Sequence, residues 1–280
     1  MALEADFAAS TFANKPGSLL ESEEADRLSF PYYIHIGPLA LHPHWVFESL
    51  AYLLGFRLYA WMRARSGDHL SGSNRMWVVA AAVAGAALGS KLLYWLADPA
   101  KTISNWNNLY YLMAGKTIVG GLIGGLIAVE WIKRRLDIRR RTGDLFAIPL
   151  AAGIAIGRVG CFLSGLGDDT YGVETSMAWG VDFGDGIHRH PTQLYEIAWL
   201  VLLAAWLSLL SRRRHREGDL FKTFMVGYFG FRLLIDFLKP GAALAGMTAI
   251  QWACCGVLIY YGADLPYLFR LKEADNQGGR

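Results

Sequence analysis

The sequence has little charge for its length, and this shortage narrows the class of protein. Asp, Glu, Lys and Arg make up only 18% of the 280 residues, whereas hydrophobic residues make up 54%. A soluble domain of this size has too small an interior to hide that much apolar surface. The net charge of +3 is also too small to indicate a nucleic-acid-binding protein.

Cysteine is scarce as well, and its spacing indicates neither disulfides nor a metal. Cys161, Cys254 and Cys255 lie in apolar stretches, without a disulfide framework or a zinc-binding spacing. The first thirty residues carry six acidic residues and no basic segment ahead of an apolar core, so they do not form a signal peptide. The sequence therefore predicts no metal, no cofactor and a first apolar segment that stays in the protein.

Long apolar segments are what the sequence has in abundance. A helix needs about 20 residues to cross a hydrocarbon core of about 30 Å, and only a helix or a closed barrel pairs every backbone group there. We expect an all-α integral membrane protein with a seven-helix domain over 36–263, an external polar segment over 1–35 and a cytoplasmic tail over 264–280. The predicted membrane-spanning segments are 44–62, 77–97, 117–133, 146–163, 195–211, 221–238 and 248–263.

Basic residues alternate between the loops and predict an orientation. They cluster after the first, third and fifth segments, whereas the loop after the fourth segment is acidic. Because basic loops face the cytoplasm, the N-terminus is predicted outside and the C-terminus inside. The basic residues are Arg63, Arg65, Arg75, Lys133, Arg134, Arg135, Arg139, Arg140, Arg141, Arg212, Arg213, Arg214 and Arg216.

Arg158 lies late in the fourth segment, between Gly157 and Gly160. Ionisable residues are costly in a membrane and tend to face a cavity or each other. A guanidinium can donate two parallel hydrogen bonds to a phosphate, and small neighbours allow close approach. We favour phosphate binding over the alternative, a buried ion pair that only holds helices together. For Cys161, three residues on, we favour a packing role over that of a catalytic thiolate.

Tyr228, Arg232 and Asp236 recur at helical spacing in the sixth segment, so they share one face. One interpretation is a local ion pair between Arg232 and Asp236. The other is that Arg158 and Arg232, both placed toward the outer leaflet, converge on one anionic headgroup. The sequence leaves both open.

Two further motifs supply candidate substrate-binding residues. Gly120 and Gly121 belong to a run of small residues at four-residue spacing, for which helix packing is the favoured explanation over substrate contact. His190, Gln193 and Glu196 open the fifth segment at the membrane surface, where a proton acceptor or headgroup ligand would be useful.

Several of these motifs, in this order, resemble the prolipoprotein diacylglyceryl transferase family over most of the chain. The resemblance implies a bacterial cytoplasmic-membrane enzyme that moves the diacylglyceryl group of phosphatidylglycerol to the cysteine thiol of a prolipoprotein lipobox, releasing glycerol phosphate. It implies no metal and no cofactor. The motifs lie at 36–42, 120–124, 157–160, 190–196 and 228–237.

The resemblance makes Arg158 and Arg232 the family's two important arginines, but the sequence departs from the family elsewhere. Val119 stands where the family has a histidine, and Cys161 where its signature has an asparagine. Two alternatives therefore stay open. One is a divergent transferase that uses an anionic phospholipid with a different acceptor. The other is a non-catalytic lipid-binding or transport protein, although the half-repeats typical of transporters are missing.

A thiol acceptor must lose its proton, because the thiolate is the nucleophile. Since Val119 cannot accept one, another base is needed. The candidates are Glu48, one helical turn after His44, and His190 with Glu196. We rank Glu48 and His190 first as catalytic bases.

Overall fold

The computed structural model describes residues 30–66, 70–213, 215–241 and 244–264. Most of the expected external segment, nearly all of the expected cytoplasmic tail and Arg214 lie outside the described residues. Within these ranges the chain is mainly helical, and seven helices have at least 12 residues. They are α2 (Pro43–Ser66), α3 (Gly72–Ala97), α6 (Ile118–Arg135), α7 (Asp144–Ser164), α8 (Thr192–Ser211), α9 (Asp219–Ile235) and α10 (Ala249–Tyr260). Each overlaps one of the seven predicted segments.

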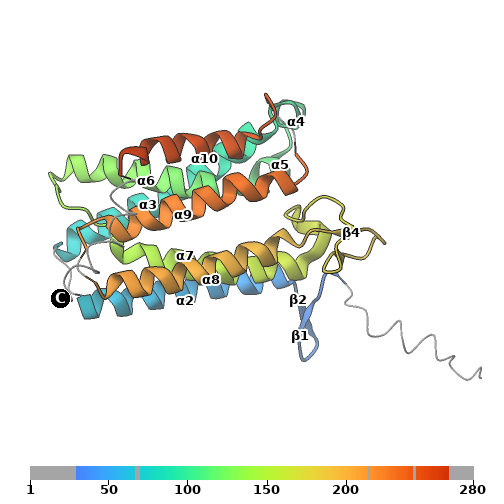
Figure 1. Ribbon diagram of the computed structural model, residues 1–280, viewed down its shortest axis with the longest axis horizontal. Helices are drawn as coiled ribbons and strands as arrows, with labels where there is room; N and C mark the ends of the chain where they lie inside the picture. The colour runs from blue at the N-terminus through green and yellow to red at the C-terminus, as the bar shows by residue number, and fades with distance from the viewer. Residues whose placement is uncertain (1–29, 67–69, 214, 242–243, 265–280) are drawn as a thin grey trace, which may run out of the picture.

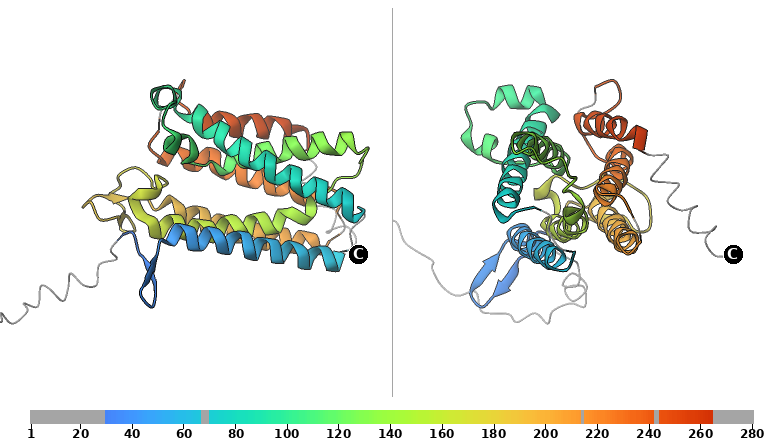
Figure 2. Two further views of the ribbon diagram at one scale, coloured as in Figure 1. Left: turned by 180° about the vertical axis from the view of Figure 1, so that it is seen from behind. Right: turned by 90° about the vertical axis from the view of Figure 1, so that its left-hand side faces the viewer.

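The long helices run side by side in alternating directions, and the shorter elements gather largely at one end (Figure 1). Helix α7 contacts α2, α8 and α9, while α3 packs on α6 and α10 packs on α9 (Figure 2). Two antiparallel strand pairs cap the end at which α7 finishes. The short elements are β1 (Ile34–Ile36), β2 (Leu39–Leu41), α4 (Pro99–Ser104), α5 (Leu109–Met113), η1 (Gly165–Asp168), β3 (Val181–Asp182), β4 (His188–Arg189), η2 (Asp236–Leu238) and η3 (Gly262–Asp264).

Three of the helices are long and apolar enough to cross a membrane by length and composition: α3, α7 continued by η1, and α8. Helices α9 and α10 are shorter, with 17 and 12 residues. Large apolar side chains nevertheless face outward from the bundle, such as Phe56 of α2, 62% exposed, and Leu88 of α3, 67% exposed. A hydrocarbon environment accounts for such exposure, whereas water makes large apolar patches unfavourable.

Glycines allow α3 and α6 to approach closely. A Cβ atom added to Gly120 would lie 2.3 Å from the carbonyl oxygen of Gly89, and one added to Gly124 would lie 2.2 Å from that of Gly85. A Cβ on Gly121 would meet its nearest atom, the carbonyl oxygen of Ala86, at 3.5 Å. The predicted packing role is confirmed for Gly120, whereas substrate contact by either Gly120 or Gly121 stays a prediction.

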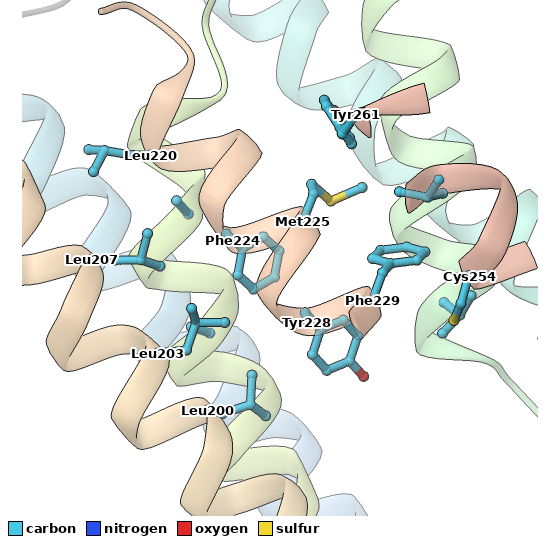
Figure 3. Packing of buried hydrophobic residues seen from close by; sticks show 14 of the residues in the cluster. Leu200, Leu203, Leu207, Leu220, Phe224, Met225, Tyr228, Phe229, Cys254 and Tyr261 are labelled. Carbon is cyan, nitrogen blue, oxygen red and sulfur yellow. The ribbon is translucent and has the colours of Figure 1, made fainter. Parts of the chain in front are cut away.

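The hydrophobic core joins α8 to α9 and α10 (Figure 3). Leu200 and Leu207 of α8 are fully buried, as are Phe224 and Tyr228 of α9. The rings of Phe224 and Tyr228 stack with their centroids 6.0 Å apart. This packing fixes α9 against α8 and so sets where the polar side chains of the two helices meet.

Candidate active site

Glu196 of α8 is the centre of a buried polar network that joins three helices. Its Oε1 accepts a hydrogen bond from the Tyr228 hydroxyl at 2.7 Å. Its Oε2 lies 2.9 Å from Nε of Arg158 on α7 and accepts from Nη1 of Arg232 on α9 at 3.1 Å. The Glu196 side chain is 1% exposed. Four predicted site residues are therefore brought together, and both arginines are paired with the same carboxylate.

Asp236 extends this network to α10. Nη2 of Arg232 donates to Oδ1 of Asp236 at 2.6 Å, so the pair expected from their spacing is present. It is not self-contained, because the same guanidinium also holds Glu196. The hydroxyl of Thr248, which caps the start of α10, donates to Oδ2 of Asp236 at 3.3 Å. Arg232 thus ties α8 to the ends of α9 and α10.

Some buried polar atoms beside the network have no aligned hydrogen-bond partner within the described residues. These are Nε of Arg232 and both amide atoms of Gln193, whereas Nε of Arg158 is paired with Glu196. The Gln193 residue is only 1% exposed. Each unpaired buried group costs about 1–3 kcal/mol. These atoms are therefore available to bind a ligand or water.

Formal charge in the network is balanced, with two guanidiniums against Glu196 and Asp236. Lys239, just beyond η2, changes this balance with pH. It keeps part of its surface exposed, yet burial, together with repulsion from Arg232 and Arg158, lowers its pKa to about 7. Protonation of Lys239 gives the site its net positive charge.

A second polar cluster meets the first through Arg158. His44 at the start of α2 places Nδ1 2.9 Å from Oδ1 of Asp168 in η1. Cys161 lies with them, and the ligand atoms of the three residues are all within 4.8 Å of one another. Nη1 of Arg158 is 3.7 Å from Sγ of Cys161. Asp168 and the grouping of the three residues were not predicted, because His44 of α2 is far along the chain from Cys161 and Asp168 at the end of α7 and in η1.

Glu48 and Asp168 lie near different nitrogens of the His44 ring, Glu48 near Nε2 and Asp168 near Nδ1. Oε2 of Glu48 is 3.6 Å from Nε2 of His44, so the one-turn spacing of Glu48 and His44 does bring them together. Oε1 of Glu48 accepts from the hydroxyl of Tyr52 at 3.1 Å and also pairs with Lys116. Glu48 is thereby held in one orientation toward the imidazole.

His190 has different hydrogen-bond partners from Glu48, the other candidate base. Its Nδ1 lies 3.2 Å from the hydroxyl of Tyr195, which accepts from Nε1 of Trp179 at 2.7 Å. Within the described residues His190 forms no hydrogen bond or ion pair with Arg158, Arg232 or Glu48. The structure thus separates two candidate bases that the sequence ranked together.

Fold and site together define a helical protein of the membrane type with a buried arginine–carboxylate centre at one end. The chain belongs to the prolipoprotein diacylglyceryl transferase family, whose model matches residues 31–265. A phosphatidylglycerol–prolipoprotein diacylglyceryl transferase of Bordetella bronchiseptica is 34% identical over 262 residues, covering 86% of this chain and 95% of the relative. Relatives of the same name from Cupriavidus pinatubonensis and Nitratidesulfovibrio vulgaris are 30% and 29% identical, covering 88% and 89% of this chain.

Proposed function

We propose that this protein transfers the diacylglyceryl group of phosphatidylglycerol to the cysteine thiol of a prolipoprotein. The observation that carries the proposal is the convergence of Arg158 and Arg232 on one buried carboxylate, beside the unpaired Nε of Arg232 and amide of Gln193. A leaving phosphate needs such donors to stabilise its charge. The names of the relatives supply the two substrates and the reaction.

Each residue of the network has a proposed role. Arg158 and Arg232 bind the phosphate, with Nε of Arg232 as the first available donor. Glu196 and Tyr228 hold the two guanidiniums in place, and the amide of Gln193 binds a headgroup oxygen. Gly120 and Gly121 remain proposed substrate-binding residues on α6.

The acceptor thiol must be deprotonated close to the phosphate, and this favours Glu48 with His44 over His190. His44 lies in the cluster that contains Cys161, whose sulfur contacts Arg158. No such connection to Arg158 is found for His190 within the described residues. Transfer then forms a bond from the acceptor sulfur to the glyceryl carbon and breaks the bond from that carbon to the phosphate oxygen.

We further propose that all seven long helices span the cytoplasmic membrane of a bacterium, over a domain of 36–263. Their alternating directions place the basic loops after α2, α6 and α8 at one end, opposite the site (Figure 1). With the basic loops in the cytoplasm, residues 1–35 are external and 264–280 cytoplasmic. The site then opens to the side on which exported preproteins arrive.

Mass spectrometry tests the reaction directly. The purified protein is incubated in detergent micelles with phosphatidylglycerol and a synthetic lipobox peptide. We expect the peptide mass to rise by one diacylglyceryl group and glycerol phosphate to be released. A peptide with serine in place of cysteine is the matched control and should stay unmodified. Release of glycerol phosphate without peptide modification, or modification of the serine peptide, would contradict a thiol acceptor.

A further inference from the structure

His44 lies between two carboxylates, at the end of the bundle where α7 finishes. Its Nδ1 is 2.9 Å from Oδ1 of Asp168, and its Nε2 is 3.6 Å from Oε2 of Glu48. An ionised carboxylate only accepts hydrogen bonds, so an imidazole whose two nitrogens both face carboxylates is bound best when both nitrogens carry a proton. The geometry therefore favours a positively charged imidazolium, and this form cannot accept a proton from a thiol.

We propose that Asp168 is a positioning residue that keeps His44 charged, and that this charge stabilises the acceptor thiolate while Glu48 takes the thiol proton. The inference rests on the proposed function for the identity of the acceptor. It narrows the role of base, assigned above to Glu48 with His44, to Glu48 alone. A cation within about 4–6 Å of a thiol favours the thiolate, which is the nucleophile, about tenfold or more.

Asp168 is itself fixed in the orientation that this role requires. Its second oxygen, Oδ2, accepts a hydrogen bond from the hydroxyl of Thr170 at 2.8 Å. The carbonyl oxygen of Thr170 accepts in turn from the hydroxyl of Thr192 at 2.6 Å, and Thr192 is fully buried at the start of α8. The Asp168 side chain is only 11% exposed. A carboxylate that is held on both oxygens and shielded from water interacts more strongly with His44 than an exposed one would.

The side of His44 that faces Glu48 is more open than the side that faces Asp168. The side chains of His44 and Glu48 are 31% and 21% exposed, and Lys116, which pairs with Glu48, is largely exposed. A base must lie within hydrogen-bond reach of the group that it deprotonates. An incoming thiol therefore meets Glu48 before Asp168, so Glu48 is placed to take the proton and Asp168 to hold the charge.

Cys161 connects this cluster to the proposed phosphate-binding arginines. Its Sγ and the facing atoms of His44 and Asp168 all lie within 4.8 Å of one another, and Nη1 of Arg158 is 3.7 Å from the same sulfur. A thiolate beside His44 is thus close to a phosphate bound by Arg158. The sulfur loses its proton to the Glu48 carboxylate and bonds to the glyceryl carbon. The electron pair of the breaking carbon–oxygen bond leaves with glycerol phosphate, and Glu48 then releases the proton to water.

Nitrogen NMR of the histidine rings tests the charge of His44 without an activity assay. The full-length protein is labelled with ¹⁵N-histidine in detergent micelles, and the His44 signals are assigned as those missing in His44→Gln. We expect both ring nitrogens of His44 to be protonated at about pH 7.5, where an ordinary histidine is neutral. In Asp168→Asn the ring should become neutral at a lower pH. A neutral His44 ring in the unmodified protein at that pH would overturn the inference.

Glu174→Gln is the matched control, because it neutralises an exposed carboxylate at the same end of the molecule. It should change neither the His44 signals nor lipid transfer. Elution from a sizing column in detergent shows which variants fold. Thr170→Val is a milder second variant, since it removes only the hydrogen bond to Oδ2 of Asp168. It should shift the titration of His44 in the same direction as Asp168→Asn, but less.

The pH dependence of lipid transfer tests what the charge does. Among the described residues, the titratable or charged groups that face His44 directly or through one further contact are Asp168, Glu48, Cys161, Lys116 and Arg158. Relative to the unmodified protein, Asp168→Asn should lower transfer about tenfold at about pH 8, where its His44 is neutral, and much less at about pH 6. Glu48→Gln should lower transfer at both. An equal loss at both pH values in Asp168→Asn would mean a merely structural role and would sink the inference.

The two measurements separate this inference from the proposed function. Lipid transfer to the cysteine peptide by a protein whose His44 is neutral would contradict the inference alone. A charged His44 that responds to Asp168→Asn, in a protein that modifies no peptide at any pH, would contradict the proposed function and leave Asp168 as the residue that holds the charge.

Discussion

Arg158 and Arg232 share the Oε2 atom of Glu196, which leaves each guanidinium with other N–H groups for a phosphate. Lysine would keep the charge but lose the planar fork. We expect Arg158→Lys and Arg232→Lys each to lower transfer about tenfold to a hundredfold, equivalent to about 1.5–3 kcal/mol for one charge-assisted contact. Arg139→Lys, at a side chain that is 89% exposed, should leave the rate unchanged. Full activity in a folded double variant would contradict the phosphate-binding role.

Glu196 also carries part of the stability of the bundle, because both arginines contact this carboxylate. Removing its charge in Glu196→Gln leaves buried guanidinium charge uncompensated, which costs about 3–5 kcal/mol. Tyr228→Phe removes a single hydrogen bond to a charged group and should cost about 1.5–3 kcal/mol. Thermal unfolding in detergent should rank Glu196→Gln as the less stable variant. Equal unfolding temperatures would mean that the ion pairs add nothing beyond the hydrogen bond.

We expect Lys239 to make lipid binding depend on pH. Its pKa of about 7 means that it is neutral above this pH and protonated below it. Since the protonated form adds a positive charge beside Arg158 and Arg232, binding of phosphatidylglycerol should strengthen as the pH falls from about 8 to about 6, on either side of this pKa. Lys239→Met should abolish this dependence and Lys239→Arg should keep binding strong throughout. Lys101→Met, an exposed lysine of α4, is the control and should behave as the unmodified protein.

Substitutions at the two adjacent glycines of α6 can distinguish a role in helix packing from a role in substrate contact. Gly120 faces the backbone of α3, and a methyl group there would overlap the carbonyl oxygen of Gly89. Gly120→Ala should therefore push α3 and α6 apart and lower the unfolding temperature in detergent. Gly121→Ala, with its nearest contact at 3.5 Å, should unfold near the temperature of the original protein. If Gly121→Ala folds normally but loses lipid transfer, the substrate-binding role proposed for it gains direct support.

The long elements could be predicted from sequence because each is a separate run of apolar residues with charged loops around it. The starts of α2 at Pro43 and of α8 after Pro191 follow from local preferences of proline. The strand pairs, α4 and α5 were not predicted, because elements this short leave no periodic pattern. Their placement depends on contacts with the ends of the long helices.

The site could be predicted only in part for a related reason. Helical spacing identified the pair of Arg232 and Asp236 correctly, but it could not show that Glu196 of another helix is held by both arginines. The grouping of His44, Cys161 and Asp168 has no sequence signature for the same reason. His44 comes from α2, whereas Cys161 and Asp168 come from α7 and η1, and only the packing of α2 on α7 joins them.

The two ends of the molecule differ in charge. The loops after α2, α6 and α8 carry the arginine clusters, and two of them are joined by an ion pair of 2.7 Å between Arg140 and Glu217. The other end carries the strand pairs and the acidic residues Asp182 and Asp185, of which the latter pairs with Arg189 at 2.6 Å. Basic residues stay in the cytoplasm during insertion, so this asymmetry predicts a single orientation.

Cysteine labelling in intact cells tests that orientation for the whole chain. Cys161 and Cys254 are buried, so replacing Cys255 with alanine gives a background with little reaction. In it, Ser176→Cys, an exposed position between η1 and β3, should react with a thiol reagent that does not cross the cytoplasmic membrane. Arg139→Cys, in the loop between α6 and α7, should react only after the cells are opened. The reverse pattern would place the arginine–carboxylate network on the cytoplasmic side, away from an exported lipobox, and the proposed acceptor would have to be abandoned.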